Sequence, residues 1–370
     1  MKGNVIDMSA KPVPAASNEP VRQVTFHDIT AIMGPEGRRR QNLAGFEPVY
    51  ADFVDYIIGC THRIWDDRGV GLIDTHYTHN PVVFTPYGTT YSREEIVAST
   101  LRTMAGYADR RGYGNEVIWS GDDKNGFYSS HRVTSVARNT GWTEFGPPTH
   151  RKLHWVTVAD CMVFENRIYK EWIVRDYLGI VLQLGLDPRE VGAKMAARKA
   201  ARGEALPDYG DIDRLRGQFP APADWAGPAT DDPVAAMVCQ LLHDVWNRRR
   251  FDRIAQVYAP HAVTHVPAMR SIVGREAYCG YAISTLAMMS NAGLFIRHVC
   301  SVPGAGNERL VAVRWTLDGH HDGPGRLGEA TGKRLALWGI SHFRVADGQI
   351  LEHWMVADEL ALFMQIALPA

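Results

Sequence analysis

The feature that most constrains this chain of 370 residues is a stretch that occurs twice. The copies begin at positions 165 and 347, where the chain reads E-N-R-I-Y-K-E-W-I-V-R-D-Y-L-G-I-V-L-Q-L-G and D-G-Q-I-L-E-H-W-M-V-A-D-E-L-A-L-F-M-Q-I-A. Each copy predicts an acidic turn, an alternating strand, an Asp at the strand end and an apolar helix. The interval from Trp172 to Trp354 is the same as that from Asp176 to Asp358.

The similarity between the two halves extends well beyond this stretch. Phe53 aligns with Val234, and after one extra residue in the second half Arg93 aligns with Arg275. The alignment then continues unbroken to the closing stretch. The period far exceeds the roughly 50 residues of solenoid repeats, so the chain is one fold used twice. We predict an N-terminal arm at 1–45, a first domain at 46–187, a basic helix and linker at 188–232, and a second domain at 233–370.

Each half predicts helices first and a run of strands afterwards. A long helix (46–65 in the first half) precedes a short strand (81–85; 262–266) and a second helix (93–104; 275–288). Helices followed by consecutive strands indicate an α+β fold, in which the helices pack on one face of an antiparallel sheet. The four strands that follow are expected near 115–121, 126–138, 151–164 and 168–176, and again near 294–302, 308–318, 333–345 and 349–358.

Composition excludes several classes of protein. An apolar content of 45% and a charged content of 22% are typical of a globular chain. A net charge of −1 argues against nucleic acid or an anionic membrane as the main partner, because both favour a basic surface. The chain shows neither the apolar run of a signal peptide nor the roughly 18 apolar residues of a membrane span. The 5 cysteines are widely spaced and form no C-x-x-C pair, so we expect a reducing cytoplasm.

The sequence gives little indication of a cofactor or a metal. The chain has no P-loop and no G-x-S-x-G sequence. His261 and His265 are four residues apart, but Pro260 and the neighbouring valines predict a turn that enters a strand, where that spacing does not bring two ligands together. We therefore predict neither a cofactor nor a metal.

The closing strand suggests a site. Successive side chains of a strand point to opposite faces, so Trp172 and Asp176, four residues apart, share a face, as do Trp354 and Asp358. We expect each pair to line an apolar pocket that contains a single acid. Burial would raise the pKa of this carboxylate and make it a stronger base. The alternative is that each Asp only caps the helix that follows.

At this point the residues resemble a known family. A helix that ends in W-N, a Tyr before a strand, and the sequences R-W-T-x-x-G-H-H-D-G, G-E-A-T-G-K and D-G-Q-I-L-E-H-W-x-x-x-D are similar to those of SnoaL-like polyketide cyclases. These belong to the nuclear-transport-factor-2-like superfamily of cone-shaped α+β barrels. The second copy matches best, over roughly 233–370.

The resemblance implies a curved sheet wrapped around a long helix, with a deep apolar pocket. It also implies that an Asp at the end of the last strand is the base of an intramolecular aldol closure without metal or cofactor. That role maps onto Asp358, and onto Asp176 in the first copy. The family's His maps onto His321, whereas the first copy has Asn139 there, so the resemblance favours catalysis by the second copy.

Other candidate residues recur at matched positions. Arg132 and Arg314 could polarise a carbonyl oxygen or hold a substrate carboxylate, although a plain ion pair across strands is the simpler explanation. His265 could assist Asp358, and His62 and His243 could face the pocket mouth, or all three could be ordinary core or surface side chains. The residues expected to bind substrate are Trp354, Trp172, Trp246, Trp65, Tyr258, Tyr77, His243 and His62.

Two functions follow from these patterns. The first is a cofactor-independent enzyme that enolises a small carbonyl or polyketide-like compound for aldol cyclisation, dehydration or isomerisation. Hydrolysis of an epoxide or ester by an Asp-activated water is a related possibility. The second is a non-catalytic module that binds an apolar ligand or mediates dimerisation, since duplication would build an intrachain pseudo-dimer. A further homo-oligomer is compatible with either function.

Overall fold

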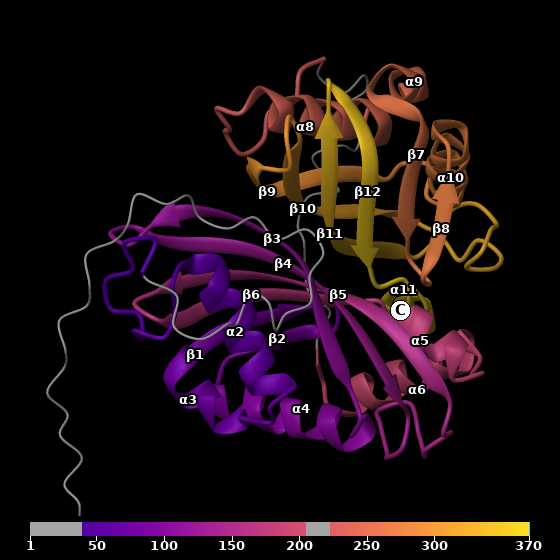
Figure 1. The fold of residues 1–370 in the computed structure, drawn as a ribbon. Coiled ribbons are helices and arrows are strands. Elements are labelled where there is room, and N and C mark those ends of the chain that lie inside the picture. The colour runs from indigo at the N-terminus through magenta and orange to yellow at the C-terminus, as the bar shows by residue number, and fades with distance from the viewer. Residues whose placement is uncertain (1–38, 205–222, 370) are drawn as a thin grey trace, which may run out of the picture.

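The computed structural model describes residues 39–204 and 223–369, and it contains two similar halves (Figure 1). Each half is a six-stranded sheet with helices, which confirms the predicted α+β class and its tandem repetition. The arm predicted at 1–45 lies mostly outside the described residues, as does the middle of the linker predicted at 188–232. No helix of the described residues is long and apolar enough to cross a membrane.

The first half, called the N-terminal domain here, follows the predicted order with two additions. A short strand, β2, was not predicted, and short helices precede β1. The elements are α2 (Phe53–Trp65), η1 (Val70–Leu72), α3 (Ile73–His76), β1 (Tyr77–Thr85), β2 (Gly88–Thr90), α4 (Arg93–Gly106), β3 (Arg111–Asp122), β4 (Gly126–Arg138), β5 (Lys152–Phe164), β6 (Arg167–Arg175), α5 (Tyr177–Gln183) and α6 (Pro188–Ala201).

The second half, the C-terminal domain, repeats this order. The unpredicted strand recurs as β8, at the equivalent place. The elements are α8 (Pro233–Trp246), η2 (Phe251–Arg253), α9 (Ile254–Val257), β7 (Tyr258–Val266), β8 (Arg270–Val273), α10 (Arg275–Met288), β9 (Gly293–Pro303), β10 (Arg309–His320), β11 (Arg334–Ala346), β12 (Gln349–Ala357) and α11 (Leu360–Ala367).

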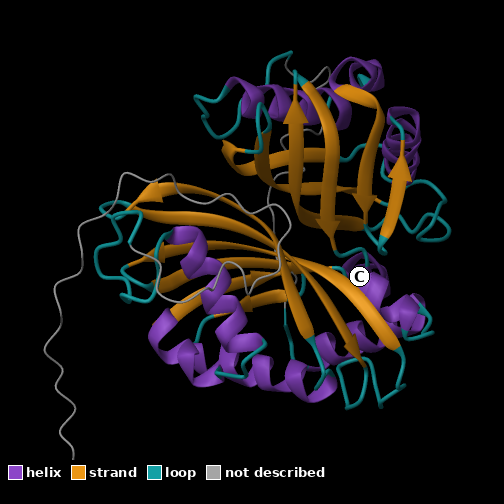
Figure 2. Ribbon diagram, in the orientation of Figure 1, coloured by secondary structure: helices purple, strands orange, loops and turns teal. Residues whose placement is uncertain are grey.

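The two sheets have the same topology. Their strand orders are β2-β1-β6-β5-β4-β3 and β8-β7-β12-β11-β10-β9. All neighbouring strands are antiparallel except β1 with β6 and β7 with β12, which are parallel, so the sheets are mixed rather than purely antiparallel as expected. Helices cover one face of each sheet (Figure 2).

The first helix begins later than its apolar pattern suggested. Helix α2 starts at Phe53 instead of residue 46, because Asp52 is its N-cap and accepts a hydrogen bond from the backbone N–H of Asp55 at 2.8 Å. The apolar residues before Asp52 still reach the core, since Phe46 packs edge-on against Tyr56 with ring centroids 4.9 Å apart. The periodic pattern therefore marked a buried segment that is only partly helical.

The two sheets pack against each other through the faces that the helices leave uncovered. One apolar cluster joins β3 and β4 to β9 and β10, and includes Ile118, Tyr128 and Leu310. Another joins β5 and β6 to β11 and β12, and includes Val158, Val174 and Ile340. The duplicated chain thus forms an intrachain pseudo-dimer, and we call the contact surface the interdomain interface.

Charged groups are also buried in this interface. The imidazole of His342 lies between Glu116 Oε2, at 2.6 Å from Nδ1, and Ser130 Oγ, at 2.8 Å from Nε2. Arg314 Nε lies 3.3 Å from Asp160 Oδ2. A charge removed from water is costly unless it is paired, so these pairs fix which side chains of one domain meet which of the other.

Helices α5 and α6 connect the two domains: Ile180 of α5 packs in the core of the N-terminal domain, and α6 packs on the C-terminal domain. Leu178 and Val191 belong to the apolar core of the C-terminal domain. Helix α6 approaches α11 so closely that a Cβ added at Gly192 would lie 2.8 Å from the carbonyl carbon of Phe363. The segment after β6 is therefore part of the connection between the domains and not a free linker.

Candidate functional site

The two faces of β6 lie in different surroundings. Glu171 and Arg175 line a cavity inside the N-terminal domain, between the sheet and α2. Trp172 alternates with them and packs in the interdomain interface, and Asp176 also lies on that side. Trp172 and Asp176 are therefore not on the wall of the cavity inside the N-terminal domain. They share a face, as predicted, but it is the face turned toward the other domain.

The same correction applies to the second copy. Trp354 packs in the interdomain interface, and Asp358 is fully buried there. The Asp358 carboxylate accepts hydrogen bonds from Tyr87 Oη at 2.5 Å, from Leu178 N at 3.2 Å and from Leu360 N at 3.1 Å. Burial raises the pKa of Asp358 to about 8, against the effect of the Tyr87 hydrogen bond. Asp358 is on the wall of neither cavity described below.

Asp176 is held in an equivalent way. Its carboxylate caps α5 through Gly179 N at 2.9 Å, and it accepts Ala268 N at 3.1 Å and Met269 N at 2.7 Å from the C-terminal domain. Burial raises the pKa of Asp176 to about 6, while these backbone N–H groups oppose the shift. Each strand-end Asp thus binds the β-hairpin of the other domain, the 85–88 turn or the 267–270 turn. Both acids join the two domains.

The predicted arginines lie in the interface too. The Arg132 guanidinium stacks over Trp354, 4.0 Å from the ring centroid, and Arg314 stacks over Trp172 at 3.7 Å. Arg132 Nη2 also lies 3.8 Å from Glu116 Oε2. The ion pairs of Arg132 with Glu116 and of Arg314 with Asp160 favour the ion-pair interpretation over the catalytic one, and the cation–π contacts hold both guanidinium groups in the interface.

A cavity of about 280 Å³ opens between the domains. Asp176 lies on its wall together with His265, Met269 and Trp354. The His265 ring stacks on the Trp354 indole with centroids 3.5 Å apart, and its Nε2 lies 3.2 Å from Glu352 Oε1. His265 therefore does not contact Asp358, the residue it was expected to assist.

The cavity inside the N-terminal domain is smaller, about 90 Å³, and lies where the family resemblance places a pocket. Two of the predicted residues, Trp65 and Tyr77, are on its wall. The chain supplies four further groups there that the sequence patterns missed. These are Arg110, His131, Glu171 and Arg175.

Glu171 is the acid of this cavity. Its side chain is buried, and Tyr77 Oη donates a hydrogen bond to its Oε2 at 3.1 Å. Burial raises the pKa of Glu171 to about 7, although the Tyr77 hydrogen bond and the positive charge of Arg175 both lower it. The carboxylate and the carboxylic acid therefore coexist near neutral pH, which suits a group that must accept and return a proton.

The C-terminal domain has no acid at the equivalent position. In the aligned closing stretches His353 takes the place of Glu171, and Tyr258 takes that of Tyr77. Tyr258 Oη lies 2.8 Å from His353 Nδ1, while His353 Nε2 lies 3.1 Å from Ser341 Oγ. Burial lowers the pKa of His353 to about 3, so its imidazole is neutral. Phe343 stacks on it with centroids 4.1 Å apart.

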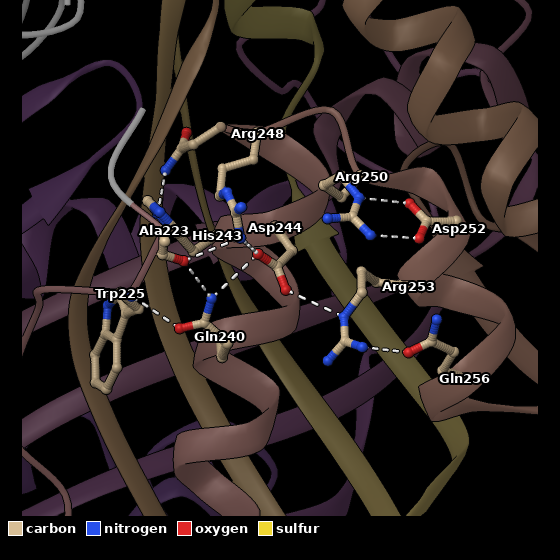
Figure 3. Close-up of polar contacts among 11 residues, drawn as sticks. Ala223, Trp225, Gln240, His243, Asp244, Arg248, Arg250, Asp252, Arg253 and Gln256 are labelled. Carbon is tan, nitrogen blue, oxygen red and sulfur yellow. Dashed lines mark hydrogen bonds and ion pairs between the residues drawn. The ribbon is translucent and has the colours of Figure 1, made fainter. Parts of the chain in front are cut away.

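The remaining predicted residues lie apart from the N-terminal cavity. His62 Nε2 pairs with Asp67 at 3.4 Å, and His321 Nδ1 lies 3.1 Å from Thr331 Oγ1. Trp246 is buried in the core of the C-terminal domain. His243 contacts Asn247 at 3.1 Å, next to a polar cluster in which Asp244 binds Arg248 and Arg253 (Figure 3). This cluster also holds Ala223 and Trp225 of the linker through Gln240.

Comparison with known proteins agrees with the predicted family. Residues 236–366 match the model of the family described as SnoaL-like polyketide cyclase. This confirms the resemblance that the closing motif predicted. No curated protein matches the chain.

Similar solved structures include a protein from Jannaschia sp. CCS1 described as a candidate SnoaL-like polyketide cyclase. It is 17% identical, with a TM-score of 0.33, over 39% of this chain and 100% of its own. IdmH from Streptomyces antibioticus, described as a candidate polyketide cyclase, is 22% identical, with a TM-score of 0.32, over 37% and 100%. TsrD from Streptomyces laurentii is 21% identical, with a TM-score of 0.32, over 38% and 100%.

Proposed function

We propose that the protein is a cofactor-independent acid–base enzyme of the SnoaL-like type, and that its reaction takes place in the cavity of the N-terminal domain with Glu171 as the base. The observation that carries the proposal is a buried carboxylate on a cavity wall with its pKa raised to about 7. Strand-end acids remain part of the architecture, but the hydrogen bonds of Asp176 and Asp358 give them a structural role.

The chemistry that fits is enolisation of a small carbonyl compound. The Glu171 carboxylate takes a proton from the carbon next to the carbonyl group. The C–H electron pair becomes a C=C bond, and the carbonyl π pair moves to oxygen as an enolate. In an isomerisation, the enolate is conjugated with a neighbouring C=C bond, and protonated Glu171 returns the proton at the far carbon of that system. In an aldol closure, the enolate carbon forms a C–C bond to a second carbonyl carbon, the π pair of that carbonyl moves to its oxygen, and protonated Glu171 gives its proton to the resulting alkoxide. No electrons are gained or lost.

The enolate oxygen needs hydrogen-bond donors that are already in place. His131 lies on the wall of the same cavity as Glu171, and the guanidinium groups of Arg110 and Arg175 add positive charge there. Tyr77 keeps the Glu171 carboxyl group in one position through its hydroxyl group. The cavity therefore combines a base with groups that stabilise negative charge, which is the minimum an enolising site requires.

The test is exchange of the α-protons of carbonyl compounds with solvent deuterium, followed by NMR. We expect the wild-type protein to accelerate exchange for part of a panel of short ketones, aldehydes and oxo acids. Glu171→Gln should lower the rate by about a hundredfold or more, the usual contribution of a general base. Glu165→Gln, an exposed position in the turn before the same strand, is the matched control. Equal rates in the two variants would sink the proposal.

A second candidate function is binding of an apolar ligand between the domains. The observation that favours it is the cavity of about 280 Å³, whose wall includes Val156, Met269 and Met355. Asp176 and His265 on this wall are already hydrogen-bonded, so the cavity is better suited to binding than to proton transfer. Indole is a suitable probe. It should raise the melting temperature of the wild type and of Val136→Trp, an exposed control, but not that of Val156→Trp.

A further inference from the structure

The charges around the N-terminal cavity do not balance. Arg110 and Arg175 are both on its wall, and Glu171 is the acid that faces them. No carboxylate of residues 39–204 or 223–369 lies within 4.0 Å of Arg175, whose Nη1 donates to Tyr177 Oη at 2.6 Å, and Glu144 acts on it only from farther away. A guanidinium group keeps its charge even when it is buried, so the cavity carries an excess of positive charge.

The positive charge of Arg110 is only partly neutralised by a neighbouring carboxylate. Its Nη1 lies 3.6 Å from Asp66 Oδ2, which is an ion-pair distance but too long for a good hydrogen bond. That Nη1 is buried and has no hydrogen-bond partner among the described residues. The guanidinium also stacks over Trp65, 4.9 Å from the ring centroid, and this contact holds its plane in place.

His131 adds a second unsatisfied group. Its side chain is 4% exposed and lies on the wall of the cavity, and its Nε2 has no hydrogen-bond partner among the described residues. A buried polar atom without a partner is costly, so native structures rarely keep one without a reason. A bound molecule with an oxygen near Nε2 would supply the missing partner.

We infer that the substrate is a small carboxylate that also carries a carbonyl group, with its carboxylate held by Arg110 and Arg175 and its other oxygen beside His131. This inference rests on the proposed function, because it names the substrate class of the same cavity. A volume of about 90 Å³ holds roughly half a dozen water molecules at 10–15 Å³ of probe space each, so the compound has about as many heavy atoms. Short 2-oxo and 3-oxo acids meet these conditions.

Binding can be measured on the wild-type protein alone, by calorimetry or ligand-observed NMR. Pyruvate and acetoacetate are compared with methyl pyruvate and acetylacetone, which keep the carbonyl groups but lack the charge. We expect the acids to bind about tenfold or more tightly than their neutral counterparts, the usual worth of a charged hydrogen bond. If the neutral compounds bind equally well, or only they bind, the inference is overturned.

Variants then locate the anion. Arg110→Met and Arg175→Met should each weaken binding of the acids about tenfold, whereas Arg110→Lys should retain part of the affinity. Arg167→Met, at an exposed position on the same strand as Arg175, is the matched control. Circular dichroism checks that each variant is folded. Equal affinities for Arg110→Met, Arg175→Met and Arg167→Met would contradict the assignment of the two arginines.

Glu171→Gln separates this inference from the proposed function. It should bind the acids at least as tightly as the wild type, because it removes a negative charge from the cavity, while it loses proton exchange. If exchange persists in Glu171→Gln but the acids still bind through Arg110, the proposed function fails and the substrate class stands. If exchange depends on Glu171 but only neutral ketones bind and react, the substrate class fails and the proposed function stands.

Discussion

Glu171 and His353 occupy the same position of the closing strand in the two domains, and each is hydrogen-bonded to the equivalent tyrosine, Tyr77 or Tyr258. One position therefore holds a carboxyl group that titrates near neutral pH, and the other an imidazole that stays neutral. The two domains share a fold but differ in the chemistry at their centres, and the proposed function uses the acid–base group of the N-terminal domain.

The pH dependence of stability should reveal Glu171. Its pKa is about 7 in the folded protein and near 4.5 when exposed, so between these values the folded state binds more protons. The free energy of unfolding therefore falls as the pH rises from about 4.5 to 7, by about 3 kcal/mol for this group. Glu171→Gln should lose that contribution in urea titrations at pH 5 and pH 8, whereas Glu165→Gln should keep it.

His353 should act in the opposite direction. A base whose pKa is lowered from 6.5 to about 3 stabilises the folded state above pH 6.5, and this stability is lost as the pH falls.

Tyr258→Phe removes the hydroxyl next to His353 Nδ1 and should cost about 1–3 kcal/mol at pH 7. Tyr169→Phe, at a half-buried position of β6, is a control. An equal loss in both would contradict the proposed role of the Tyr258 hydrogen bond.

The hydrogen bonds of Asp176 and Asp358 should contribute to the stability of the interdomain interface and not to the rate of proton exchange. Tyr87→Phe leaves Asp358 without its hydroxyl partner and should lower the free energy of unfolding by about 1–3 kcal/mol. Its effect on proton exchange should be small, since Tyr87 lies on neither cavity wall. Tyr91→Phe, at an exposed position, provides the comparison. A loss of exchange in folded Tyr87→Phe would instead return the chemistry to Asp358.

Arg314 should contribute to the stability of the protein through its ion pair with Asp160. Arg314→Met leaves Asp160 buried without its ion-pair partner and should cost about 3–5 kcal/mol in chemical denaturation. The double variant Arg314→Met, Asp160→Leu should recover much of this loss, because it removes both charges together. If the double variant is no more stable than the single one, the ion pair is not the cause of the loss.

Close packing of α6 on α11 can be tested at one glycine. Gly192→Val places side-chain atoms against the backbone of Phe363 and should destabilise the protein by about 1–3 kcal/mol. Gly203→Val is a less informative control because its φ of +63° is itself unfavourable for valine. Gly280→Val, on α10, has open space around its Cβ and should not destabilise the protein, because valine has a higher helix propensity than glycine. Limited proteolysis should also show α6 released only in Gly192→Val.

The fold was largely predictable because its signals are local. The nearly constant offset between the halves and the alternating strands predicted the two domains and most element bounds to within a few positions. Strands β2 and β8 were missed because such short strands hold too little pattern. The parallel pairing of β1 with β6 was also missed, since it depends on a connection through the whole domain and on no nearby turn.

The candidate site was predictable only in part, because strand β6 is buried on both of its faces. An alternating strand that is covered on one side identifies its inner face, but β6 is covered by α2 on one side and by the C-terminal domain on the other. The conspicuous Trp172 and Asp176 therefore pointed to the wrong side. A usable signal was present: Glu171 and His353 are polar at a matched position, and each follows a matched tyrosine at almost the same interval along the chain.

The pairing of acidic residues with histidines in the interdomain interface has a consequence for which domains can associate with each other. Glu116 and Asp160 of one domain are replaced by His298 and His342 at the equivalent positions of the other. A symmetric pair built from two N-terminal domains would bring acids against acids, and one built from two C-terminal domains would bring imidazoles against imidazoles. Because the two domains are covalently joined, their interface need not be symmetric, and the two contact surfaces can be complementary instead of identical. If the two domains are expressed separately and mixed, we expect the N-terminal domain to form a heterodimer with the C-terminal domain in preference to either homodimer.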